Sequence, residues 1–72
     1  MIRNYVVDVD VKDESLASEI LEEFVNRGNI DVASCERILN KGRAVSCFYV
    51  RCPEDDLENF KNALIERGVE LL

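Results

Sequence analysis

The chain has 72 residues, of which 47% are hydrophobic, and nine basic and fifteen acidic side chains give it a formal net charge of −6. This length predicts one domain spanning residues 1–72. It is near the lower limit for a stable core without metal or disulfides, so association with a second copy would add stability. The composition excludes a disordered or fibrous chain, and no apolar run suits a signal peptide or a membrane span. We therefore predict a cytoplasmic domain without a membrane partner, and the negative charge makes nucleic acid an unlikely ligand.

The cysteines are three in number and irregularly spaced, and the chain has no histidine. Such a set predicts neither a disulfide framework nor a zinc site, and it favours a reducing compartment. No neighbouring residue suggests a lowered thiol pKa or a base that could activate a nucleophile. We therefore predict a non-enzymatic chain without cofactor or metal, in which the cysteines are structural: Cys35, Cys47 and Cys52.

Acidic residues gather where the first strand is expected to end. Carboxylate oxygens are the ligands that magnesium and calcium prefer, so this group offers a hard-cation site as an alternative. A solvated strand end followed by a helix cap explains the same residues and is the interpretation we favour. The group consists of Asp8, Asp10, Asp13 and Glu14.

The first half of the chain shows a strand followed by a helix. Residues 2–11 alternate between apolar and polar side chains, which predicts a strand with one buried face. Asp13 is placed to cap the helix, and Arg27-Gly28 is a typical helix end. The helix carries a continuous apolar stripe formed by Leu16, Ala17, Ile20, Leu21, Phe24 and Val25.

The second half repeats part of this pattern. Leu21-Glu-Glu-Phe-Val-Asn and Leu57-Glu-Asn-Phe-Lys-Asn each precede an Arg-Gly pair. A second helix is predicted to start at Pro53, with Asp55 and Glu58 as a capping box. Its inward residues are predicted to be Leu57, Phe60 and Leu64, and residues 69–72 are predicted to form a short last strand.

Residues 30–52 read as a β-hairpin. Lys-Gly is unfavourable in a two-residue turn because Lys41 would need a positive φ, so we predict a three-residue loop, Asn40-Lys41-Gly42. In that register Cys35 lies opposite Cys47, close enough for a disulfide under oxidation, and Val32 lies opposite Val50. The predicted inward face is Ile30, Val32, Ser34, Glu36, Ile38, Ala44, Phe48, Val50 and Cys52.

The element order β-α-β-β-α-β with right-handed crossovers predicts an α+β, ferredoxin-like sandwich. It has a four-stranded antiparallel sheet of order 4-1-3-2 and two helices on one face. The opposite face would then expose an apolar patch large enough to favour a homodimer. The patch consists of Val6, Ala33, Cys35, Val45, Cys47 and Tyr49.

From residue 9 to residue 71 the chain resembles an ACT domain, a small-molecule-binding module that regulates many amino-acid enzymes. The first helix, the start of the second strand and the chain end carry the resemblance, through Ala17, Ile20, Phe24, Gly28-Asn29-Ile30-Asp31 and Gly68-Val69-Glu70-Leu71. The ligand loop differs, because Lys12-Asp13-Glu14-Ser15 stands where the family has Pro-Gly.

The resemblance implies a regulatory or assembly domain that binds an amino acid or a similar small effector weakly. The helix amides of Ser15 and Leu16 would hold the effector's carboxylate and Asp10 its ammonium group. The implied ligand residues are Asp10, Asp13, Ser15, Leu16 and Asn29.

Two alternatives stay open. The RNA-recognition motif has the same strand order, and four of the nine cations lie on the hairpin, so this segment could bind nucleic acid or a protein partner. The aromatic positions of that motif are held here by Arg43 and Val45. A designed chain without biological function is the third reading.

Overall fold

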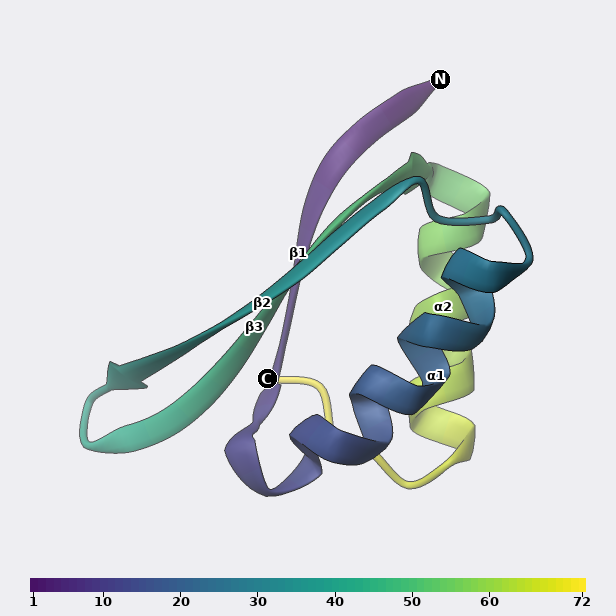
Figure 1. Ribbon diagram of the computed structural model, residues 1–72. Helices are drawn as coiled ribbons and strands as arrows, with labels where there is room; N and C mark the ends of the chain where they lie inside the picture. Colours follow the sequence, from purple (N-terminus) through teal and green to yellow (C-terminus); the bar gives the residue numbers. More distant parts are fainter.

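The computed structural model describes residues 1–72 and follows the predicted order of elements as far as the second helix. It is an α+β domain in which both helices pack on the same face of an antiparallel sheet (Figure 1). Neither helix is long and apolar enough to span a membrane. The elements are β1 (Ile2–Asp10), the 3-10 turn η1 (Val11–Asp13), α1 (Glu14–Asn26), β2 (Val32–Asn40), β3 (Arg43–Pro53) and α2 (Glu54–Glu66).

The sheet has three strands, in the order β1-β3-β2, so the predicted four-stranded sheet of order 4-1-3-2 is wrong. In the segment 69–72, Val69 is buried in the core, Leu71 bridges Val9 of β1, and the N–H of Leu72 donates to the Asp8 carbonyl at 3.0 Å. A single bridging residue cannot supply the repeated hydrogen bonds of a ladder. The chain end therefore lies beside β1 without forming a strand.

Helix α1 confirms most of the predicted apolar stripe. Ala17, Ile20, Leu21 and Phe24 are buried, whereas Val25 at the last turn is exposed. Asp13 occupies the N-cap position without a side-chain hydrogen bond. The side-chain cap lies three residues earlier. There the Asp10 carboxylate accepts a hydrogen bond from the backbone N–H of Lys12 and caps the start of η1.

Helix α2 starts one residue later than predicted. Pro53 is its N-cap, in an extended conformation, and no capping-box hydrogen bond forms. The predicted inward residues Leu57, Phe60 and Leu64 are confirmed as buried. Phe60 meets Phe24 of α1 edge-to-face at a centroid distance of 5.6 Å, a favourable aromatic geometry that joins the two helices.

The hairpin register differs by one residue from the prediction. Asn40 pairs with Arg43, which leaves a two-residue turn in which Lys41 (φ 52°) and Gly42 (φ 78°) both have positive φ. This is the type I′ geometry, whose twist matches that of the flanking strands. The strain at Lys41 is a local cost of about 1–2 kcal/mol, which nine cross-strand pairs can outweigh.

The new register changes which residues of β2 face the helices. Residues directly opposite each other share a face. Cys35 and Ala33 pair with Phe48 and Val50, so they lie on the inner face, which the helices cover. The outer residues of β2 are Val32, Ser34, Glu36 and Ile38.

The predicted pairs and faces of β2 change with the register. Val32 was expected opposite Val50 on the inner face but lies opposite Arg51 on the outer face, where Ser34 and Ile38 also lie. Glu36 was expected on the inner face but lies on the outer face, where its carboxylate accepts a hydrogen bond from the Tyr49 hydroxyl at 3.1 Å. Cys35 was expected opposite Cys47 but lies opposite Phe48, on the other face of the sheet from Cys47. All three cysteines are free, and a disulfide between Cys35 and Cys47 has no geometric basis.

Candidate interaction surface

The N-terminal end of α1 carries the shortest side-chain hydrogen bonds in the molecule. Two nitrogens of Arg37, Nε and Nη2, donate to the two oxygens of Glu14 at 2.8 and 2.7 Å. The buried Ser46 hydroxyl donates to the same carboxylate at 2.8 Å. These hydrogen bonds, with those of Arg37 first, lower the pKa of Glu14 to about 2. Glu14 therefore ties β2 and β3 to the start of α1.

Asp10, which was predicted to bind the effector's ammonium group, forms a second ion pair. Asp10 accepts a hydrogen bond from Nε of Arg43 at 3.1 Å and lies 3.0 Å from Nη2 of the same guanidinium, in addition to accepting from the backbone N–H of Lys12. The Lys12 hydrogen bond and then Arg43 lower the pKa of Asp10. The carboxylates of Glu14 and Asp10 are thus already paired with the chain's own arginines.

The structure does not bring the predicted ligand residues together. Asp10, Asp13, Ser15 and Leu16 lie near the start of α1, and Leu16 packs against the core. Asn29 lies beyond the other end of this helix, about 20 Å away by its thirteen residues, and donates to Asp56 at 3.2 Å. These five residues cannot surround one small effector.

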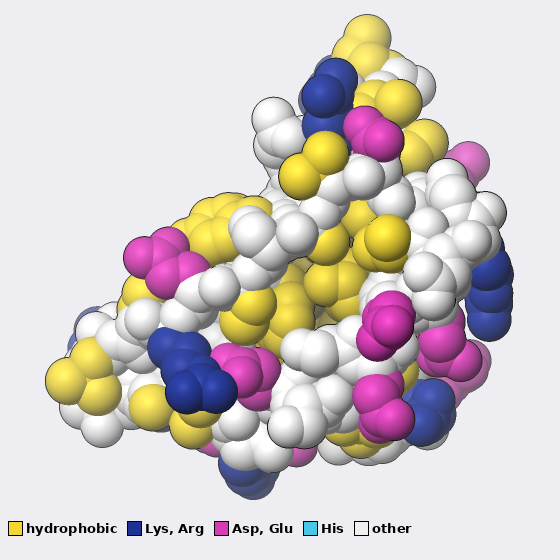
Figure 2. Space-filling model, in the orientation of Figure 1, with side chains coloured by type: hydrophobic (Ala, Val, Ile, Leu, Met, Phe, Trp, Pro, Cys, Tyr) yellow, Lys and Arg dark blue, Asp and Glu magenta, His cyan; other side chains and the backbone are white.

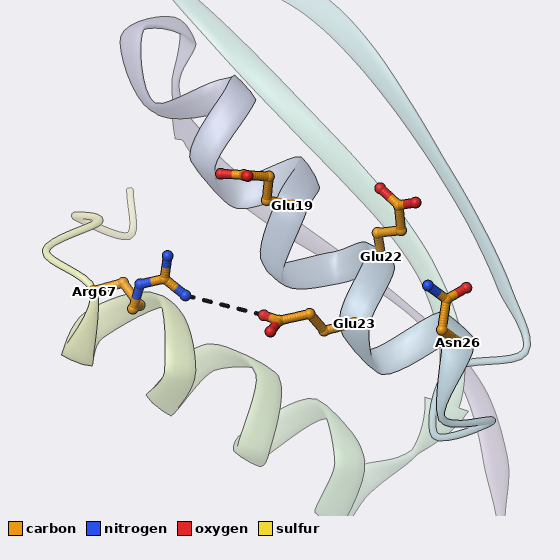
Figure 3. Close-up of a pocket in the computed structure, with 5 residues that line it drawn as sticks. All are labelled: Glu19, Glu22, Glu23, Asn26 and Arg67. Carbon is orange, nitrogen blue, oxygen red and sulfur yellow. Dashed lines mark ion pairs between the residues drawn. The ribbon is translucent and has the colours of Figure 1, made fainter.

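The exposed side of α1 holds a polar hollow of about 260 Å³, with no hydrophobic lining. Figure 3 shows Arg67 directed to Glu23 at 4.0 Å, while Glu22 and Asn26 point away from it. A pair this long and exposed contributes little. The hollow has the character of a solvated helix face, and no group of three or more acidic or cysteine side chains is arranged to hold a metal ion.

The outer sheet face is more polar at its centre than predicted. One row across the three strands contains Asp8, Cys47 and Glu36. The adjacent Asp8 carboxylate and then burial raise the pKa of Cys47 to about 11. Oδ1 of Asp8 is buried without a hydrogen-bond partner. Two carboxylates therefore flank the middle of this face.

The predicted interface residues are divided between the two faces. Val6, Val45, Cys47 and Tyr49 lie on the outer face, but Val45 and Cys47 are already buried by their neighbours within the chain. The corrected register places the other two members, Ala33 and Cys35, on the inner face. The six residues do not form one patch.

The β2 strand is exposed along its whole length. All nine residues are exposed, including Leu39 at 76% and Val32 at 55%. It is an edge strand, because only β3 pairs with it, so alternate N–H and C=O groups along the other edge have no strand partner. Figure 1 shows the hairpin extending away from the helices on this side.

An apolar groove of about 320 Å³ runs between β2 and α1. Figure 2 shows hydrophobic side chains open to view in the hollow between the strand and the helix. Eight residues line it, five of them hydrophobic: Ser18, Leu21, Glu22, Val25, Ala33, Ser34, Cys35 and Phe48. The groove and the free strand edge form one continuous surface, which we call the β2 edge. Sequence reasoning missed it because the wrong register buried Val32 and turned Ala33 and Cys35 outward.

The hairpin cations are partly neutralised. Arg37 and Arg43 are in ion pairs with Glu14 and Asp10. Phosphate binding depends on uncompensated cations, so the geometry gives little support to a nucleic-acid surface on the hairpin.

Compared with protein-family models, curated proteins and solved structures, the chain matches none of them. The resemblance to ACT domains therefore rests on its short sequence motifs alone.

Proposed function

We propose that this chain is a non-enzymatic self-association domain that extends its sheet through the β2 edge. The observation that carries the proposal is a nine-residue edge strand, exposed along its full length and bordered by an apolar groove. An unpaired edge beside apolar surface is the arrangement to which another strand adds. A small domain with a limited core gains stability from such an association.

Support for a non-enzymatic role comes from the side chains that could do chemistry. The pKa values of all three thiols are raised, by burial first for Cys35 and Cys52 and by Asp8 first for Cys47. A raised pKa leaves little thiolate, the nucleophilic form, near neutral pH. The two carboxylates with lowered pKa values, Glu14 and Asp10, form ion pairs with arginines.

Effector binding of ACT type has less support. The residues that would bind an amino acid are separated along α1, and Asp10 is paired with Arg43. An amino acid would have to displace this internal ion pair. Assembly without an effector is therefore the function that we propose.

The outer sheet face supports association less well than the β2 edge. A partner on this face would bury the carboxylates of Asp8 and Glu36, and burying charges without new partners is costly. Among its exposed apolar residues, Ile38 is separated from Val6, Tyr49 and Val32 by the row that holds Asp8 and Glu36.

The test is sedimentation equilibrium over a range of concentrations, with variants of each surface. Asn40 and Arg43 form the hydrogen-bonded pair that closes the turn, so the backbone groups of every second residue before Asn40, such as Ser34, bond to β3. The N–H of Ala33 therefore points to the free edge. Ala33→Pro should therefore block an added strand while keeping the hairpin, and Cys35→Lys should place a charge in the groove. Val6→Lys is the matched control on the outer face.

We expect the wild type and Val6→Lys to dimerise, and both β2 variants to be monomers with unchanged helical circular dichroism. A wild type that stays monomeric at millimolar concentration would contradict the proposed function. Loss of the dimer in Val6→Lys but not in Cys35→Lys would move the interface to the outer face.

A further inference from the structure

We infer that two copies pair antiparallel through β2, about a two-fold axis that passes at Cys35. The two three-stranded sheets then become one sheet of six strands. The inference rests on the proposed function and adds to it the orientation, the register and the contacts of the partner.

The symmetry limits the choice of register. A two-fold axis perpendicular to the sheet keeps all four helices on one face, and residues opposite each other in an antiparallel pair share a face. Only registers in which one residue of β2 meets its own copy satisfy both conditions. The choice is therefore which residue lies at the axis.

Charge and strand length select Cys35. An axis at Glu36 sets two carboxylates directly opposite each other, and an axis at Arg37 does the same with two guanidinium groups, which destabilises the pair. An axis at Ser34 limits the pairing to residues 32–36, because β2 begins at Val32. With the axis at Cys35, residues 32–38 of each copy pair without a like-charge contact.

The selected register also gives exposed residues new partners. On the outer face, Val32 lies opposite Ile38 of the second copy, and both are exposed in the single chain. Ser34 lies opposite the second copy's Glu36, to which its hydroxyl can donate. Each contact occurs twice because of the symmetry.

Opposite charges meet on the inner face. The second copy's Arg37 lies opposite Ala33 and diagonal to Asp31, within reach of a long side chain. Ala33 and Glu22 line the same groove, so this carboxylate is also near the incoming arginine. Arg37 binds Glu14 through Nε and Nη2, which leaves Nη1 for such a contact.

The groove provides the room that the pairing needs. It separates α1 from β2, so the helix does not cover the strand edge, and Cys35 is exposed within it. The other two cysteines are buried. Cys35 is therefore a natural probe of the axis, because the two copies of this residue would be about 5.5 Å apart between Cα atoms, a separation that a disulfide spans.

The experiment compares rates of cross-linking by diamide, which accepts the two hydrogens released as two thiols form a disulfide. The wild type is compared with Cys35→Ser and with the double variant Cys35→Ser/Glu36→Cys, which moves the thiol by one residue. Linked peptides are identified by mass spectrometry, and sedimentation equilibrium of each reduced protein measures its dimer.

We expect the wild type to link through Cys35 at least tenfold faster than the double variant, and Cys35→Ser to remain unlinked. Equal or faster linking of the double variant would overturn the Cys35 axis. A reduced dimer that does not link through Cys35 would also overturn it and leave the proposed function standing. Absence of a reduced dimer would instead overturn both.

Discussion

The two strands of the hairpin have similar apolar content but opposite environments. In β3, six of eleven residues are buried, whereas in β2 all nine are exposed. The difference lies in the neighbours: β3 is flanked by β1 and β2 and packs against the helices, and β2 has one strand neighbour and a groove beside it. Position within the sheet, rather than composition, decides which strand forms the core and which remains available to a partner.

The comparison is tested most strongly by the same substitution in both strands. Val50 of β3 is 2% exposed and Val32 of β2 is 55% exposed. Val50→Ala should lower the free energy of unfolding by about 2 kcal/mol, through lost burial and a cavity, and Val32→Ala by less than about 0.5 kcal/mol. Urea unfolding at micromolar concentration, where association is weak, measures both. Equal losses would show that β2 is covered in the single chain.

The turn offers a test of the register on which the comparison depends. Lys41 has a φ of 52° before Gly42, and Asn-Gly is the preferred pair for this turn. Lys41→Asn should therefore raise the free energy of unfolding by about 0.5 kcal/mol. Lys41→Ala is the control and should give no gain. Destabilisation by Lys41→Asn would favour a three-residue loop and return Val32 to the inner face.

A smaller effect concerns the hydrogen bonds between Arg37 of β2 and Glu14 of α1. The pKa of Glu14 is lowered from 4.5 to about 2, mainly by Arg37. Its contribution to stability is therefore complete above about pH 4.5 and is lost as the pH falls toward 2. Glu14→Gln should make unfolding less dependent on pH in this window, measured by urea titrations at several pH values.

Glu58→Gln, on the exposed surface of α2, is the control for this measurement. The Glu14 tie would be contradicted if both variants kept the acid dependence of the wild type.

Much of the fold could be predicted because it depends on local patterns. The stripe of α1, the inward residues of α2 and the alternation of β1 follow from helix and strand periodicity. The prediction of a last strand at residues 69–72 was wrong, because pairing with β1 depends on where Val69 enters the core and not on the four residues alone.

The interaction surface could not be predicted from the sequence for a related reason. A one-residue change of register moves every side chain of a strand to the other face. The penalty for positive φ at Lys41 favoured the wrong loop, and the cross-strand pairs that outweigh it are non-local. Arg37 and Glu14 are 23 positions apart, and no sequence spacing indicates that they meet.

Amide hydrogen exchange measured by NMR at low and high protein concentration tests the role of β2 most directly. The N–H groups of Ala33, Cys35 and Arg37 point to the free edge, and those of Ser34 and Glu36 point to β3. The account predicts that raising the concentration slows exchange at the first three by at least tenfold and leaves the other two nearly unchanged. Fast exchange at Ala33, Cys35 and Arg37 in a sample that sediments as a dimer would contradict it.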